Sequence, residues 1–229
     1  MPEPTYRRRT SLLLALALAP LLALSGCQTT TPELRADANN ARAVGDFDAA
    51  IASRRAVVER HPSNPLYRYE LGQVLLEAGE PGAAREQLFL AYEAVPDNAT
   101  YLEAYADGLI ATRDLETMYA VLRDAIPPKG ERWPAYVRLG DYAFRAGHAD
   151  EAERAYVEAG NLATTLDPEP QRRLASLYRR VGDTPNEIAR LRMILWFNPA
   201  DAEAAPRLRQ LGEVPGPGFR LFPRGEYTP

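Results

Sequence analysis

Residues 65–98, PLYRYELGQVLLEAGEPGAAREQLFLAYEAVPDN, predict two short amphipathic helices joined by a tight turn. In the first helix, Leu71, Val74 and Leu75 recur at the spacing of one helical face. The second helix repeats the pattern with Ala84, Leu88, Ala91 and Val95. The turn between them is Gly79-Glu80-Pro81-Gly82. Neither apolar face is wide enough to stabilise a helix alone, so the hairpin is expected to stack on copies of itself.

Copies of this hairpin follow one another at a period of 34 residues, with one step of 35. The residues at the turn position are, in chain order, Gly45, Gly79, Arg113, Gly147 and Gly182. One position of the second helix is held by Ala50, Ala84, Met118, Ala152 and Glu187. A large-small pair in the first helix recurs as Leu71-Gly72, Tyr105-Ala106, Leu139-Gly140 and Leu174-Ala175. Five turns in one frame indicate a repeat protein rather than an accidental succession of hairpins.

Each recurring residue type has a physical reason. Glycine or alanine in the first helix lets the second helix approach closely, and a turn glycine ends the first helix in a left-handed conformation. Proline cannot continue a helix interior, so prolines are expected to follow the second helices, at Pro62, Pro96 and Pro199. Two residues after each proline stands a side chain suited to cap the next helix, namely Asn64, Asn98 and Asp201.

The sequence resembles the tetratricopeptide repeat (TPR) family, which has this period. The residues that match the family motif are Leu71, Gly72, Gly79, Ala84, Leu88, Ala91 and Pro96. The resemblance implies an all-α fold, a TPR α-solenoid of about five helical hairpins plus a C-terminal capping helix over Asp201 to Leu211. The expected hairpins are 33–64, 65–98, 99–132, 133–166 and 168–201, within a solenoid that spans 33–211. The third is the most degenerate, because Arg113 replaces its turn glycine.

The N-terminal residues 1–26 predict a cleaved signal peptide. Three arginines, 7–9, precede an apolar run that is shorter than the roughly 20 residues of a transmembrane helix and is interrupted by Pro20. The run ends in Leu24-Ser25-Gly26-Cys27, which resembles the lipobox of bacterial lipoproteins. The resemblance implies that Cys27 is acylated and becomes the first residue of the mature chain. The alternative is an ordinary cleavage site beside a chance cysteine, although Cys27 is the only cysteine present.

The remaining boundaries follow from this assignment. Residues 27–32 are expected to form a lipidated polar tether, and Gln28 after the cysteine resembles the sorting pattern for the outer membrane, on the side facing the periplasm. The tail 212–229 is rich in proline and glycine, which excludes a long helix. Three interpretations of the tail stay open: a disordered end, a partner-binding peptide, or docking of Phe219 to Phe222 against the capping helix.

Little in the sequence suggests catalysis. The chain has two histidines, His61 and His148, which lie two and a half repeats apart and are not expected to meet. No metalloprotease, nucleophile-elbow or phosphate-binding motif is present, so neither an enzyme nor a cofactor is predicted. The 27 basic and 31 acidic side chains give a net charge of −4, which argues against a nucleic-acid partner.

The TPR resemblance implies that the first helices of successive repeats line a concave groove. The predicted groove residues are Arg35, Asn39, Tyr69, Gln73, Glu103, Asp107, Asp141, Phe144, Arg172 and Arg179. In this order the lining is basic, apolar-polar, acidic, acidic-aromatic and basic again. Such banding is suited to select an extended peptide or a helix by charge complementarity. The alternative is a solvated face without an ordered charge pattern.

The predicted function is a protein-protein interaction scaffold, anchored in the outer membrane by lipid on Cys27, for assembly of a cell-envelope machine of pilus or secretion type. In architecture the chain resembles the TPR lipoproteins of Flp/Tad pilus assembly and the pilotins of type IV pili. The alternative is a glycan- or peptidoglycan-associated binding module that aids polymer export or remodelling. Trp133 and the tyrosines of the predicted groove motivate that alternative.

Overall fold

The computed structural model describes residues 29–163 and 167–223. Within these residues the chain forms eleven α-helices and one short 3-10 helix, and no strand. The helices are α1 (Thr31–Ala43), α2 (Phe47–Arg60), α3 (Pro65–Glu77), α4 (Pro81–Ala94), α5 (Ala99–Ala111), α6 (Leu115–Asp124), α7 (Trp133–Arg145), α8 (Ala149–Ala163), α9 (Glu169–Val181), α10 (Thr184–Phe197), α11 (Ala204–Gln210) and η1 (Pro217–Phe219). The predicted all-α solenoid of five hairpins and a short terminal helix is confirmed.

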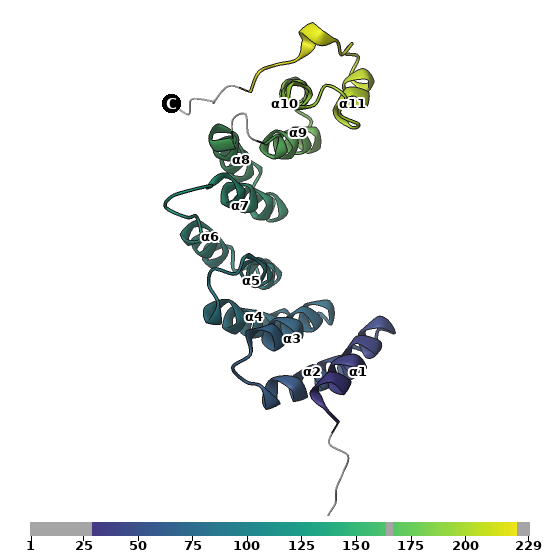
Figure 1. Cartoon of the computed structure of the whole chain (residues 1–229), viewed down its shortest axis with the longest axis vertical. Helices are drawn as coiled ribbons and strands as arrows, with labels where there is room; N and C mark the ends of the chain where they lie inside the picture. Colours follow the sequence, from purple (N-terminus) through teal and green to yellow (C-terminus); the bar gives the residue numbers. More distant parts are fainter. Residues whose placement is uncertain (1–28, 164–166, 224–229) are drawn as a thin grey trace, which may run out of the picture.

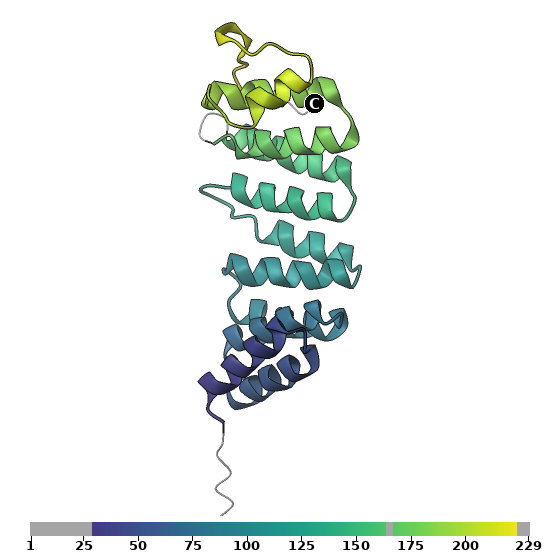
Figure 2. The same ribbon diagram turned by 90° about the vertical axis from the view of Figure 1, so that its right-hand side faces the viewer.

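The hairpins stack in one bowed row. The odd-numbered helices lie along the inner side of the bow and the even-numbered helices along its outer side (Figure 1). Seen from the inner side, the odd-numbered helices form successive rungs that cross the row, with α1 and α11 at opposite ends (Figure 2). The concave face is therefore built from the first helix of each repeat. In the described part of the chain, no helix is long and apolar enough to cross a membrane.

The predicted helix caps are present at two of three positions. The side chains of Asn64 and Asn98 accept hydrogen bonds from the backbone N–H groups of the first turns of α3 and α5, at 3.0 and 3.2 Å. Asp201 behaves differently: its carboxylate accepts from the N–H groups of Glu203 and Ala204, and Glu203 is the N-cap of α11. The capping helix therefore begins later than the predicted Asp201.

A second set of caps was missed by the sequence analysis. Asp46, Asp114 and Asp183 directly precede α2, α6 and α10, and each accepts a hydrogen bond from the N–H group three residues later, at 3.1–3.3 Å. An aspartate also compensates the positive end of the helix dipole there. The recurrence of Asp one residue after the turn position could have revealed them.

The small residues predicted in the second helices mark the core of the repeats. Ala50, Ala84, Met118 and Ala152 have no exposed surface, and Glu187 at the equivalent position of the fifth repeat is 3% exposed. The apolar side chains form three clusters in sequence order, one over the first three and a half repeats, one around α7–α9, and one around α9–α11. Each repeat thus buries its apolar face mainly against its neighbours.

The turn residue of the third repeat keeps the backbone conformation of the glycines it replaces. The turn glycines have φ near +80°, and Arg113 has φ of +60°. The N–H groups of Arg113 and Asp114 bond to the carbonyls of Ile110 and Leu109 at 2.9 Å, as the corresponding groups do after α3. The repeat therefore imposes a left-handed conformation on a residue with a Cβ atom.

Replacing Arg113 by glycine is expected to raise the free energy of unfolding by about 1 kcal/mol, because a left-handed conformation costs a non-glycine residue about that much. Arg113 is exposed and makes no ion pair with a described residue, so little is lost with its side chain. Urea denaturation followed by circular dichroism measures the change. Gly147→Arg is the matched reverse exchange and is expected to destabilise. Equal stability of Arg113→Gly and the wild type would contradict this account.

The N-terminal helix begins inside the predicted tether. Thr30 is the N-cap of α1 and forms a reciprocal capping pair with Glu33, so Thr31 and Pro32 are helical. Arg60, at the end of α2, donates a hydrogen bond to the carbonyl of Thr29. This bond ties the start of α1 to the end of α2. Cys27 and Gln28 lie outside the described residues, as does the predicted signal peptide.

The described part of the C-terminal tail docks on α10. Arg192 Nε donates to the carbonyl of Phe219 at 2.7 Å, and its guanidinium lies 4.6 Å from the centre of that ring. Phe222 meets Trp196 edge to face at 4.9 Å between ring centres. The segment from Phe219 to Phe222 therefore makes its polar and ring contacts with α10, and not with the capping helix as expected. Phe219 also packs against the apolar cluster that α10 shares with α11.

Candidate interaction groove

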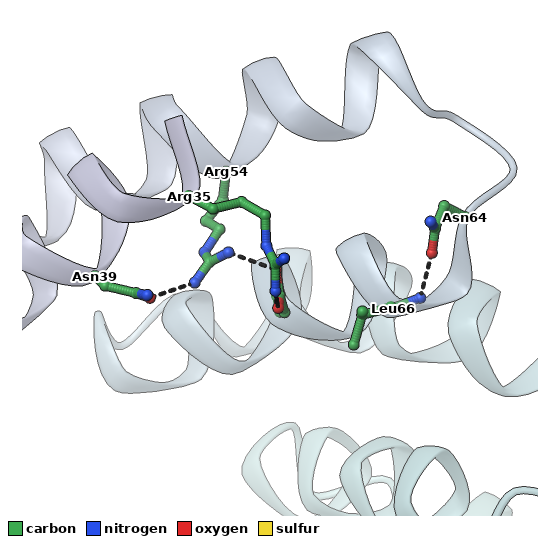
Figure 3. Close-up of polar contacts among 6 residues, drawn as sticks. Arg35, Asn39, Arg54, Asn64 and Leu66 are labelled. Atoms are coloured by element: carbon green, nitrogen blue, oxygen red, sulfur yellow. Dashed lines mark hydrogen bonds and ion pairs between the residues drawn. The ribbon is translucent and has the colours of Figure 1, made fainter. Parts of the chain in front are cut away.

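The ten predicted groove residues lie on the odd-numbered helices of the inner face, in four groups along the row. In the first group, on α1, both predicted residues are engaged by side chains of other helices. Arg35 and the buried Arg54 both donate to the carboxylate of Glu70 on α3, at 2.5 Å each (Figure 3). Arg54 also donates to the amide oxygen of Asn39 at 2.6 Å. The predicted basic band is therefore a network that ties the first repeat to the second.

The second group, on α3, is uncharged. The ring of Tyr69 lies 5.5 Å from that of Tyr101 on α5, with the planes tilted by 43°. Gln73 is half-buried on the same helix. This part of the groove therefore presents tyrosine rings and an amide group, which agrees with the apolar-polar character predicted for it.

The third group lines a central pocket of about 540 Å³ between α5, α7 and α9. Its predicted members are Glu103, Asp107, Asp141 and Phe144, and the structure brings all four together. Three arginines share the pocket and pair with the three acids: Arg138 with Glu103 at 2.8 Å, Arg145 with Asp107 at 2.7 Å, and Arg173 with Asp141 at 3.4 Å. The pocket lining in the band predicted as acidic thus contains as many arginines as acids, and Arg173 also pairs with Glu169 of its own helix at 2.9 Å.

None of these three arginines was predicted, although the sequence contains a sign of one of them, Arg138. Three pairs of opposite charges on successive inner helices are one period plus one residue apart, 35 positions. The pairs with this spacing are Arg35 and Glu70, Arg42 and Glu77, and Glu103 and Arg138. A search for complementary charges at that spacing would have found Arg138, but not Arg145 or Arg173, whose partners in the pocket are at other spacings.

Buried tyrosines hold two of the acids in the central pocket. The hydroxyl of Tyr142 lies 2.6 Å from the carbonyl oxygen of Glu103 and 3.0 Å from Asp107 Oδ1, and the hydroxyl of Tyr156 donates to Asp141 at 2.7 Å. Burial raises the pKa of both phenols, and the neighbouring carboxylates raise it further. Both tyrosines therefore stay protonated at neutral pH. Tyr156 is a donor to Asp141, and Tyr142 is a donor shared between the Glu103 carbonyl and Asp107.

The fourth group lines a second pocket of about 390 Å³ between α9, α10 and α11, called here the C-terminal pocket. Arg172, Ser176 and Arg179 of α9 form one side of it. Arg172 pairs with the buried Asp201 at 2.5 Å, and Arg207 of α11 pairs with the buried Glu187 through two hydrogen bonds of 2.7 and 3.0 Å. The helix α9 contributes to both pockets, through Arg173 to the central one and through Arg172 to this one.

The two histidines lie apart and in different surroundings. His61 Nε2 is 2.9 Å from the hydroxyl of Thr31, at the N-terminal end of the row. His148 Nδ1 is 2.8 Å from the hydroxyl of Tyr119, on the outer side between α6 and α8. Among the described residues, no group of three or more His, Cys, Asp or Glu side chains is arranged to hold a metal ion.

Comparison with known proteins agrees with this architecture. Residues 35–99 match the family model of the tetratricopeptide repeat. A crystal structure of MamA protein is similar over 82% of this chain and 98% of its own, with a TM-score of 0.53 and 19% identity. A structure of MamA from Desulfovibrio magneticus RS-1 is similar over 76% of this chain and 97% of its own, with a TM-score of 0.52 and 13% identity. No curated protein sequence matches this chain.

The fold and the match over residues 35–99 together indicate a solenoid of the TPR type, and TPR repeats generally serve as interaction scaffolds. The matched segment covers the first two hairpins, including the motif residues from Leu71 to Pro96. At these low identities, the solved structures establish the fold alone.

Proposed function

We propose that this protein is a lipid-anchored scaffold that holds an envelope protein in its concave groove while a pilus or secretion machine is assembled. The observation that supports this most is the pair of pockets to which α9 contributes, the central pocket and the C-terminal pocket. Together their linings offer charged, apolar and amide groups. Such a surface suits an extended segment of a partner better than a small substrate.

The anchor part of the proposal rests on the lipobox-like segment that ends at Cys27. The three residues from Cys27 to the helix cap Thr30 span at most about 10 Å when fully extended. Acyl chains on Cys27 would therefore hold the first hairpin close to the membrane surface. Several chains on one residue give stable anchoring, whereas a single chain gives only marginal binding. Residue Gln28 supports the outer membrane as the destination.

Changing Cys27 to serine is expected to move the protein from the membrane fraction to the aqueous fraction, because the acyl chains can no longer be attached. Detergent phase partitioning of cell extracts measures the shift, and mass spectrometry of the wild-type N-terminal peptide reports the lipid directly. Ser25→Ala is a matched control that leaves the cysteine intact. An unmodified Cys27 in the mature wild-type chain would refute the anchor.

The scaffold part is tested by site-specific photocrosslinking in cells. A crosslinking residue at Gln73, on the inner side of α3, is expected to capture an envelope protein. The same residue at Ala120, exposed on the outer helix α6, is expected to capture none. Mass spectrometry identifies the product. Equal capture at both positions, or capture of proteins outside the envelope alone, would count against a groove-bound partner.

The glycan-binding alternative receives less support. Trp133 packs against the apolar cluster around α7–α9, and its indole N–H is buried without a hydrogen-bond partner in the described structure. A sugar-binding tryptophan would present an open ring face to solvent. Sedimentation with purified peptidoglycan tests the alternative, and the scaffold proposal expects no co-sedimentation.

A further inference from the structure

The joint between the third and fourth repeats has a pocket on each side of the row. On the inner side, the central pocket of about 540 Å³ is lined by α5 and α7, together with one residue of α9. On the outer side, a cavity of about 520 Å³ lies between α6 and α8 and is called here the outer pocket. Between the inner and outer layers, Leu139 and Tyr142 of α7 join the apolar cluster that contains Met118 and Leu122 of α6. A strip of apolar contact therefore connects the two repeats, with a pocket on either side of it.

Helix α6 and the connection after it constrain the angle of this joint only loosely. α6 has ten residues, of which two are buried, whereas the other helices of the five hairpins have 13 to 15 residues. The connection from α6 to α7 has eight residues, 125–132, whereas the four residues 61–64 and the four residues 95–98 make the connections after α2 and α4 (Figure 1). A longer connection without a helix gives neighbouring repeats more freedom to rotate against one another.

Two ion pairs cross the inner side of the joint. Arg138 of α7 pairs with Glu103 of α5 at 2.8 Å, and Arg145 of α7 pairs with Asp107 of α5 at 2.7 Å. Because each pair joins the inner edges of the two repeats, both pairs resist a motion that moves α5 and α7 apart.

Polar contacts of a different kind cross the outer side. Arg123 of α6 pairs with Glu151 of α8 at 2.6 Å, and the hydroxyl of Tyr119 on α6 lies 2.8 Å from His148 Nδ1. The rings of Tyr119 and His148 also stack, with their centres 5.8 Å apart and their planes inclined by 16°. These contacts resist a motion that moves α6 and α8 apart. That motion is the reverse of the one on the inner side, because the two sets of contacts lie on opposite sides of the apolar strip.

The contacts on both sides are exposed, whereas the strip between them is buried. The side chains that form the three ion pairs are 21–54% exposed, and pairs with such exposure contribute little free energy each. The four residues of the strip are at most 5% exposed. The strip is therefore suited to act as a pivot, and the exposed contacts are suited to break and re-form as the repeats rotate about it.

We propose that the solenoid bends at this joint, and that the bend angle is set by the inner ion pairs acting against the outer contacts. Straightening the joint opens the central pocket and widens the concave face, and bending it opens the outer pocket. The joint thus couples contacts on the outer surface to the width of the groove. This inference goes beyond the scaffold function, since it depends neither on the lipid anchor nor on a bound partner.

Distances between spin labels, measured by double electron-electron resonance, test the hinge. Cys27 is the only cysteine, so the mature chain with Cys27→Ser is labelled only at introduced cysteines. One pair, Gln73→Cys on α3 with Ser176→Cys on α9, spans the joint. The control pair, Ala36→Cys on α1 with Gln73→Cys, lies wholly on the N-terminal side of the joint.

Arg138→Gln with Arg145→Gln removes the inner ion pairs. This double variant is expected to lengthen the distance between positions 73 and 176, because the outer contacts are then unopposed. The ratio of straightened to bent molecules is expected to rise about fivefold, the combined effect of two exposed ion pairs. The distance between positions 36 and 73 is expected to stay unchanged.

Tyr119→Phe with Arg123→Gln removes the outer ion pair and hydrogen bond, and is expected to shorten the distance between positions 73 and 176. Arg42→Gln is the matched control, since Arg42 and Glu77 form an exposed ion pair between α1 and α3, away from the joint. It is expected to leave that distance unchanged. Circular dichroism melts check that the variants are folded, and each double variant tests the sign of the change by itself.

An unchanged spanning distance in either double variant, shifts of both in the same direction, or an equal shift in Arg42→Gln would overturn the hinge. Photocrosslinking at Gln73 reports on the scaffold proposal separately, so that proposal can survive the loss of this one.

Discussion

Replacing Arg207 by alanine is expected to lower the free energy of unfolding by about 3 kcal/mol, the cost of leaving a buried charge without its partner. Glu187 is 3% exposed, and both of its oxygens accept hydrogen bonds from Arg207. Without the guanidinium, the carboxylate keeps its burial but loses its compensation. Urea denaturation of the purified chain, followed by circular dichroism at several wavelengths, measures the loss.

The double variant Glu187→Ala with Arg207→Ala is the matched control. Three other repeats have a fully buried alanine at the position of Glu187, so the repeat accepts that residue there. We expect the double variant to recover most of the stability lost by Arg207→Ala, because no buried charge remains. A double variant less stable than the single one would show that the pair contributes net stability instead of compensating its own burial.

Replacing Gly140 by valine is expected to lower the free energy of unfolding by about 3 kcal/mol, the upper part of the usual cost of overpacking a core. A Cβ atom at Gly140 would lie 2.4 Å from a ring carbon of Tyr156, and that ring is 2% exposed. The ring cannot move freely, because its hydroxyl is bonded to Asp141. The two helices of the fourth repeat would therefore have to separate.

Gly82→Ala is the matched control for this prediction. Gly82 lies in the first turn of α4, and a Cβ atom there meets nothing within 4 Å. The exchange is expected to be neutral or to stabilise by about 0.5 kcal/mol, since alanine loses less backbone entropy than glycine. Thermal melts of the two variants side by side would separate steric conflict from helix propensity. A Gly140→Val variant as stable as the wild type would contradict the close approach.

The fold followed from the sequence because it depends on local patterns that repeat. The period placed all five turns, including the third, where Arg113 adopts the conformation of the missing glycine. The start of the last helix was placed too early, because Asp201 both caps a turn and binds Arg172 of the preceding repeat. A sequence pattern shows the first role and not the second.

The electrostatics of the groove could be predicted only in part. The inner-face positions of Glu103, Asp107 and Asp141 followed from helical spacing, and the structure gathers them in one pocket. Their charge balance did not follow, since each acid meets an arginine from the next inner helix. Arg179 differs in making no ion pair in the described chain, and this distinction becomes visible only when neighbouring repeats are placed together.

The interior is divided into three apolar clusters, and this division affects how the molecule unfolds. A row of units held by nearest neighbours need not lose its structure all at once, and its ends can fray while the middle persists. The last cluster is the smallest and supports the helices that form the C-terminal pocket. A ligand bound in that pocket would therefore slow amide hydrogen exchange in α9–α11 and change it little in α3–α5.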